Sequence, residues 1–126
     1  MTASAHAREL LQRAAVAADS RAGEDLVALD VSGPLPLTDI FLLVSGNSER
    51  NVIAIADAVE DALNDAGQKT LRREGKSEGR WILLDFGDLV VHVFHQEDRQ
   101  YYSLERLWKD CPVVPFEVPS AAAARS

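Results

Sequence analysis

The sequence of 126 residues contains a single cysteine, Cys111. One cysteine excludes an internal disulfide and a cysteine-rich metal site, and this usage fits a reducing compartment. No apolar run approaches the ~20 residues that a membrane span needs. The first ten residues, MTASAHAREL, lack the basic and apolar regions of a signal peptide. We therefore expect a soluble, cytoplasmic protein.

Positive charge is also scarce, because 13 Lys and Arg residues stand against 20 Asp and Glu residues and leave a net charge of −7. Such a chain is unsuited to bulk electrostatic binding of DNA or RNA, which needs clustered basic residues. A basic protein partner is compatible with this charge. Hydrophobic residues make up 47% of the sequence. A chain of this length buries enough surface to fold as one domain without a metal or a disulfide.

The motifs of common nucleotide and metal sites are absent. Neither GxxxxGK[ST] nor GxGxxG occurs. Gly46, Asn47 and Ser48 lie between a predicted strand and a predicted helix, where they favour a structural helix cap over an anion site. His92 and His95 are three apart in a predicted strand, so they point to opposite faces, and no spacing gathers a set of zinc ligands. We expect no metal and no cofactor.

The most informative stretch covers residues 74–94, which predict a β-hairpin. Residues 81–86 and 89–94 are rich in β-branched and aromatic side chains, and Gly87 and Asp88 form a two-residue turn between them. A two-residue turn fixes the register. Trp81 is then opposite Phe94, Leu83 opposite His92, and Asp85 opposite Val90.

Side chains alternate along a strand, so the hairpin has two distinct faces. One face is wholly apolar and is expected to be core; it consists of Ile82, Leu84, Phe86, Leu89, Val91 and Val93. The other is mixed and consists of Trp81, Leu83, Asp85, Val90, His92 and Phe94. The mixed face is interpreted either as a functional surface or as a second, less perfect core. For Trp81 itself, a core position and an interface anchor are equally compatible with the sequence.

The remaining chain alternates helical and strand patterns. Helices are predicted at 3–18, where Ser4 can cap the start and Gly23 follows as a left-handed C-cap, and from the Ser48 cap to Gly67, which ends the second helix. Strands are predicted at 25–32, at 39–45 and, as a short edge strand, at 68–73, and helical turns are predicted within 96–109. This order predicts an α/β (α+β) domain with a single mixed sheet of about five strands and flanking helices. The helices should cover the apolar face of the hairpin.

The second helix carries an acidic outer face for which no Lys or Arg partner is predicted, formed by Asp57, Glu60, Asp61 and Asp65. A solvated face is the main interpretation. A surface for a basic partner is the alternative.

Catalytic candidates are few. Asp85 and His92 share the mixed face, and a carboxylate that orients a histidine is a common acid–base arrangement. No serine or cysteine in a nucleophile context accompanies them. The alternative is a histidine in a polar rim, hydrogen-bonded to the neighbouring acid. We expect no enzyme; a nucleotide-binding or nucleotidyltransferase-related enzyme that uses Asp85 and His92 is the alternative function.

Three stretches match, in order, the pattern of a known family. They are TDIFLLVSGNSERNVIAIADAVE (38–60), EGKSEGRWILLDFGDLVVHVF (74–94) and RQYYSLERLW (99–108). The shared features are a TD-aromatic strand before G-N-S, a Trp-initiated strand, D-[FY]-G-D, V-H-x-F and R-x-Y-Y-x-L-E-x-L-W. Over about residues 24–108 the chain resembles the ribosomal silencing factor family, also called Iojap-like. It departs from the pattern at Ile40 and Phe41, since many members place the aromatic directly after the Asp.

The resemblance implies a fold similar to nucleotidyltransferases, although their D-x-D acid pair is absent and Asp85 and Asp88 flank a turn instead. It implies binding to the large ribosomal subunit through ribosomal protein L-fourteen, which blocks joining of the small subunit and represses translation under nutrient limitation. It also implies a homodimer of the free protein. The expected organisation is one Iojap-like domain at 1–110 and a proline-rich, partly disordered tail at 111–126.

The mixed face of the hairpin is the expected docking surface for this partner. Apolar side chains would supply burial, and acidic ones would meet basic groups. The predicted contact residues are Glu74, Trp81, Leu83, Asp85, Asp88, His92 and Phe94. Possible supporting contacts are Lys76, Arg80, Arg99 and Tyr102. For Arg99 and Tyr102, structural support of the hairpin is an equal alternative.

Overall fold

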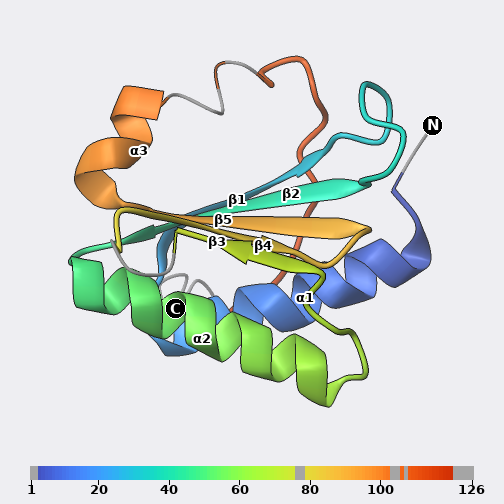
Figure 1. The fold of residues 1–126 in the computed structure, drawn as a ribbon. Helices are drawn as coiled ribbons and strands as arrows, with labels where there is room; N and C mark the ends of the chain where they lie inside the picture. The colour runs from blue at the N-terminus through green and yellow to red at the C-terminus, as the bar shows by residue number, and fades with distance from the viewer. Residues whose placement is uncertain (1–2, 76–78, 103–105, 107, 121–126) are drawn as a thin grey trace.

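The structure is a computed structural model, and it describes residues 3–75, 79–102, 106 and 108–120 (Figure 1). The elements follow in the order α1 (Ala5–Ser20), β1 (Glu24–Asp30), β2 (Ile40–Gly46), α2 (Glu49–Asp65), β3 (Arg72–Glu74), β4 (Trp81–Asp85), β5 (Leu89–His95) and α3 (Gln96–Tyr102). The five strands form one sheet in the order β1-β2-β5-β4-β3. Strands β2 and β5 are parallel and the other pairs are antiparallel. The predicted single mixed sheet is confirmed.

Helices α1 and α2 lie side by side against one face of the sheet (Figure 1). Their apolar stripes and this face of the sheet form the main core. All six side chains of the predicted apolar face of the hairpin are buried there. Burying this continuous apolar layer removes water from both the helices and the sheet, which is the dominant favourable contribution to folding. In the described part of the chain no helix has the length and apolar character of a membrane span.

The hairpin of β4 and β5 has the predicted register. Trp81 pairs with Phe94, Leu83 with His92 and Asp85 with Val90. The turn depends on Gly87, whose φ of 90° lies in the left-handed region that glycine adopts without strain. The first strand ends one residue earlier than predicted, at Asp85.

Both long helices begin at the predicted serine caps. Ser4 accepts a hydrogen bond from the Ala7 amide, and Ser48 accepts one from the Asn51 amide. Gly67 follows the end of α2, as predicted, and has a left-handed φ of 91°. The predicted left-handed conformation of Gly23 is wrong, because Ala22 takes the positive φ, 61°, after α1. Gly23 instead lies against the helix end, where a Cβ would come within 2.8 Å of the Ala18 carbonyl oxygen.

The acidic face of α2 has a basic partner that was not predicted. Arg73 in β3 places Nη1 2.7 Å from a carboxylate oxygen of Glu60 and Nη2 3.0 Å from one of Asp57. The expectation of an unpaired face is therefore wrong for these two acids. Asp61 and Asp65 are exposed. Arg73 was missed because the register of a three-residue edge strand is weakly specified by sequence.

The opposite face of the sheet, which we call the second face, carries a smaller core. Its buried members are Leu29, Val31, Leu43 and Phe94, with Phe41, Trp81, Trp108 and Cys111 packed around them. After this cluster the chain runs along β1, where Val113 forms a bridge with Leu29. Farther along, the backbone of Glu117 binds the side chain of Gln12, and Ser120 binds Asp19, both on α1. Residues 121–126 of the predicted tail lie outside the described residues.

Candidate functional site

The second face is covered over β1 and β2 and is more open over β3 and β4. Cross-strand pairs place Glu74, Leu83 and His92 in one row across the sheet. Exposure falls along this row, because Glu74 is exposed, Leu83 is half-buried and His92 is buried. We call the part over β3 and β4 the open half; it consists of Arg72, Glu74, Trp81, Leu83 and Asp85. It contains a shallow hollow of about 240 Å³ lined by Glu74, Gly75, Trp81 and Leu83.

Trp81 lies at the boundary between the covered part of the second face and the open half. Its ring stacks on Phe94 with centroids 5.1 Å apart and ring planes 27° apart. Its Nε1–H donates a hydrogen bond of 3.3 Å to Nδ1 of His92. The indole is half-buried, so one part is supported by the core and the other lines the hollow. A supported aromatic ring beside open surface is typical of interface anchors.

His92 is only 5% exposed, and burial lowers its pKa to about 4. A charged imidazole is disfavoured in this position because it would lose its hydration. The predicted Asp85–His92 pair is wrong, since Asp85 instead accepts a hydrogen bond of 2.8 Å from the Gly87 amide and stabilises the turn. The polar-rim alternative is wrong too, because the partner of His92 is Trp81. The geometry thus offers no carboxylate-oriented base on this face.

The other predicted contact residues divide by exposure. Phe94 is 1% exposed and, like His92, supports Trp81 from below without presenting area to a partner. Asp88 is half-buried, and its carbonyl oxygen accepts the amides of Asp39 and Ile40. Glu74 is exposed, with a carboxylate oxygen 3.4 Å from Nε of Arg72. Arg72 was not among the predicted residues, although it is paired with Asp85 once β3 is aligned with β4.

The predicted supporting residues are structural where the chain is described. Arg80 makes two hydrogen bonds of 2.9 Å to the carboxylate of Asp98 and lies 3.7 Å from Glu49. The Arg80 guanidinium lowers the pKa of Asp98. Arg99 is 8% exposed and donates hydrogen bonds to the carbonyl oxygen of Asp25 and to the hydroxyl of Ser45. Lys76 and the side chain of Tyr102 lie outside the described residues.

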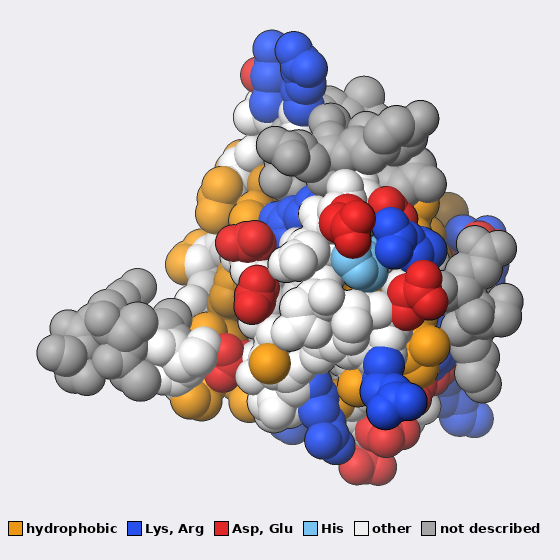
Figure 2. All heavy atoms as spheres, turned by 90° about the vertical axis from the view of Figure 1, so that its left-hand side faces the viewer, with side chains coloured by type: hydrophobic (Ala, Val, Ile, Leu, Met, Phe, Trp, Pro, Cys, Tyr) orange, Lys and Arg blue, Asp and Glu red, His pale blue; other side chains and the backbone are white. Residues whose placement is uncertain are grey.

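At the end of the sheet beside Arg80, the described side chains carry charges of both signs. Figure 2 shows acidic and basic side chains interspersed around a histidine on this end of the molecule. The ion pairs of Arg80 join the starts of α2, β4 and α3. Mixed charges of this kind hold elements together and offer no uniform field to a charged partner.

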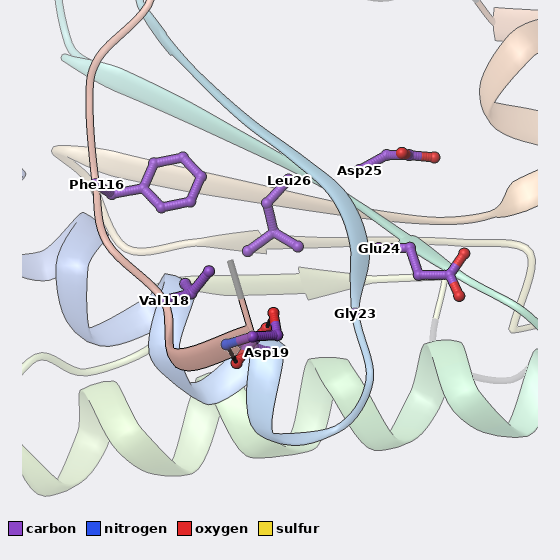
Figure 3. Close-up of a pocket in the computed structure, with 8 residues that line it drawn as sticks. Asp19, Gly23, Glu24, Asp25, Leu26, Phe116 and Val118 are labelled. Carbon is purple, nitrogen blue, oxygen red and sulfur yellow. Dashed lines mark hydrogen bonds between the residues drawn. The ribbon is translucent and has the colours of Figure 1, made fainter. Parts of the chain in front are cut away.

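A larger hollow of about 550 Å³ lies between the end of α1, the start of β1 and the C-terminal segment. In Figure 3 the side chains of Leu26, Phe116 and Val118 gather on one side of it. The carboxylates of Glu24 and Asp25 point away from them. No sequence pattern predicts this hollow, since its walls come from segments about ninety residues apart. In the described residues no group of three or more His, Cys, Asp or Glu is placed to hold a metal ion.

Comparison with known proteins identifies the family of the chain. The model of the family described as "Ribosomal silencing factor during starvation" matches residues 4–126. The chain belongs to the ribosomal silencing factor family. Over 110 residues the chain is 43% identical to the ribosomal silencing factor RsfS of Bacillus subtilis, and the aligned region covers 87% of this chain and 93% of that protein. Over 108 residues it is 30% identical to the chloroplastic protein Iojap of Zea mays, and this aligned region covers 83% of this chain and 45% of that protein.

Solved structures of similar proteins share the fold. A protein from Bacillus halodurans is 44% identical and superposes with a TM-score of 0.77 over 86% of this chain and 98% of its own. A protein from Chromobacterium violaceum is 36% identical and superposes with a TM-score of 0.79 over 81% of this chain and 85% of its own. Family membership identifies a regulatory factor named for action on the ribosome, as the sequence resemblance implied.

Proposed function

We propose that this ribosomal silencing factor binds the large ribosomal subunit through ribosomal protein L-fourteen and blocks joining of the small subunit. Translation is then repressed when nutrients are limiting. The observation that carries the proposal is the open half of the second face. There a supported tryptophan lies beside Leu83, with carboxylates at Glu74 and Asp85, in a chain of the ribosomal silencing factor family.

The chemistry of the open half suits a basic ribosomal protein. Aromatic anchors fixed before binding contribute strongly to protein–protein affinity, and Trp81 is held by Phe94 and His92. The net charge of −7 steers the chain toward a positively charged partner. Glu74 and Asp85 place negative charge beside the apolar contact, where complementary charge favours the correct partner.

Blocking subunit joining needs occupancy of a surface and no chemical step. A stable interface buries roughly 800 Å² on each partner, which is several times what one tryptophan and its neighbours provide. We therefore expect the contact to extend from the open half over the exposed edge at β3. The proposal places the protein in the cytoplasm with the ribosomes, and the free protein forms a homodimer.

Co-sedimentation with isolated large subunits tests the proposal. Trp81→Ala should abolish binding, because it removes the anchor. Asp85→Lys should also abolish it, because it reverses the charge. Asp85→Asn is the matched variant that can still accept the Gly87 amide, so it separates the loss of charge from the loss of the turn. Val113→Ala changes an exposed apolar side chain beside β1 and should bind as the unchanged protein does.

Each variant is checked by circular dichroism and thermal unfolding before binding is compared. Binding should occur with isolated large subunits and not with assembled ribosomes, and light scattering should show slower subunit joining. Unchanged co-sedimentation of folded Trp81→Ala and Asp85→Lys proteins would contradict the proposed surface. Failure of the unchanged protein to bind large subunits would contradict the proposed function itself.

A further inference from the structure

His92 is a polar side chain in an apolar position. It lies in β5 under Trp81, with Phe94 stacked beside it and the edge of Phe41 4.9 Å from its ring centroid. Its Nε2 is buried and has no hydrogen-bond partner among the described residues. A buried nitrogen without a partner destabilises a fold, so packing alone would favour an apolar ring here. Some other property of the imidazole is needed to explain it.

We propose that His92 is a positioning residue whose Nδ1 holds the indole of Trp81 in the orientation that meets the partner. The identity of the partner rests on the proposed function, whereas the effect on Trp81 does not. Positioning of this kind is distinct from contact, because His92 itself is buried.

The hydrogen bond requires an uncharged imidazole. Nδ1 accepts from the indole Nε1–H, so the one proton of the neutral ring is on Nε2. A charged ring would carry protons on both nitrogens and could not accept. Because burial lowers the pKa of His92 to about 4, the ring is neutral at physiological pH and the bond is kept.

The stacking on Phe94 and the hydrogen bond to His92 fix different degrees of freedom of Trp81. Stacking on Phe94 sets the plane of the indole, with 27° between the rings. A ring that is held by stacking alone can still slide or rotate within its own plane. The directional bond from Nε1 to His92 removes that freedom, because only one edge of the indole carries the donor. Together they leave one preferred position for the part of the ring that lines the hollow with Leu83.

Fixing the indole in advance strengthens binding, since ordering a large side chain during association weakens affinity. Loss of the His92 bond should therefore weaken binding to the partner by about three- to tenfold, with the dissociation rate carrying most of the change.

The first arm of the test measures the position of Trp81 in the free protein. Nuclear magnetic resonance of labelled protein should show a scalar coupling across the hydrogen bond between Trp81 Nε1 and His92 Nδ1. The indole proton should exchange slowly in the unchanged protein and in His92→Asn, whose side-chain oxygen can accept in place of Nδ1. It should exchange faster in His92→Phe, which keeps a ring and removes the acceptor. Trp81→Phe assigns the signal, because the chain has two tryptophans.

The second arm measures binding of purified large ribosomal subunits to the same proteins. His92→Phe should bind three- to tenfold more weakly although it is as stable as the unchanged protein or more so, and His92→Asn should recover most of the affinity. In a Trp81→Ala background, His92→Phe should have no further effect. Val90→Ala is the control, because it alters a buried residue on the same strand that pairs with Asp85, four residue pairs along the hairpin from Trp81.

The outcomes separate the two proposals. The positioning role is overturned if the coupling between Trp81 Nε1 and His92 Nδ1 is absent, or if the indole proton exchanges as slowly in His92→Phe as in the unchanged protein. This holds whether or not the large subunits bind. The positioning role is also overturned if the affinity for large subunits changes among the variants only in step with their free energy of unfolding. Failure of the unchanged protein to bind large subunits overturns the proposed function, and the resonance measurements then still decide whether His92 positions Trp81.

Discussion

The burial of His92 predicts a specific pH dependence of stability. Burial lowers the folded-state pKa of His92 to about 4, and the ordinary value in an unfolded chain is about 6.5. Between these values the unfolded chain binds the proton and the folded protein does not. The free energy of unfolding must then rise with pH across this range, because stability rises wherever the unfolded state binds more protons. The penalty for burying His92 is therefore nearly absent above pH 6.5 and grows as the pH falls toward 4.

The magnitude follows from the two pKa values. At pH 7 the histidine is almost uncharged in both states, and its titration changes stability very little. At pH 5 nearly all unfolded chains carry the proton and few folded ones do, which lowers the free energy of unfolding by about 2 kcal/mol. Below pH 4 the full difference is about 3 kcal/mol. The neighbouring rings of Trp81, Phe41 and Phe94 are uncharged, so they offer the imidazolium of His92 no compensating negative charge.

Urea unfolding between pH 4.5 and 7.5 measures this effect, with circular dichroism as the probe. The matched variant is His92→Phe, which keeps a buried ring and cannot titrate. Carboxylates whose pKa values are lowered in the fold, such as Asp30 and Asp98, also lose stabilising interactions in acid, but they are common to both proteins. The difference between the two proteins should therefore shift by about 2 kcal/mol in favour of His92→Phe from pH 7 to pH 5. Parallel profiles would refute the reasoning, because they would show that His92 is as easily protonated folded as unfolded.

Two further substitutions test the buried arginines. Arg73→Ala removes the partner of the partly buried Glu60 and should lower the free energy of unfolding by about 1–3 kcal/mol. Arg72→Ala is the control, because Arg72 belongs to an exposed ion pair, and it should lower the free energy of unfolding by less than about 1 kcal/mol. Equal urea midpoints for the two would contradict the assigned role of Arg73. Arg99→Ala removes hydrogen bonds from a buried cation to the Asp25 carbonyl and to β2, and should cost about 2 kcal/mol or more. Hydrogen exchange should show the loss first at the start of β1, and unchanged protection there would contradict it.

The hairpin was predictable because its information is local. A two-residue turn sets the pairing, and alternation then assigns every side chain to a face, so Leu83 opposite His92 follows from counting. The serine caps were predictable for the same reason, since Ser4 and Ser48 each act on an amide three residues away. Patterns of this range need no knowledge of the rest of the fold.

The burial of His92 was not predictable in that way. It depends on what covers the second face. The cover includes Trp108 and Cys111, which follow α3, and no local pattern indicates which face of the sheet these side chains reach. Arg73 shows the same limit, because its acidic partners belong to a helix that ends before β3 begins. In both cases the deciding contact joins segments that sequence reasoning had placed separately. Such contacts change the environment of a side chain without changing its local pattern.

The position of Trp81 explains why the sequence supported both a core residue and an interface anchor. Among the described residues after α3, Trp108 meets Phe41 edge to face and Val113 pairs with Leu29 in β1, so these residues cover the second face over β1 and β2. The strands β4 and β3 lie beyond this cover, so Trp81 has core on one side and the open half on the other. An anchor needs both conditions, because a ring without core support must be ordered on binding and a fully covered ring cannot be reached. The two interpretations therefore describe two sides of one indole, and on the docking surface that we propose the edge of the cover sets where a partner can bind.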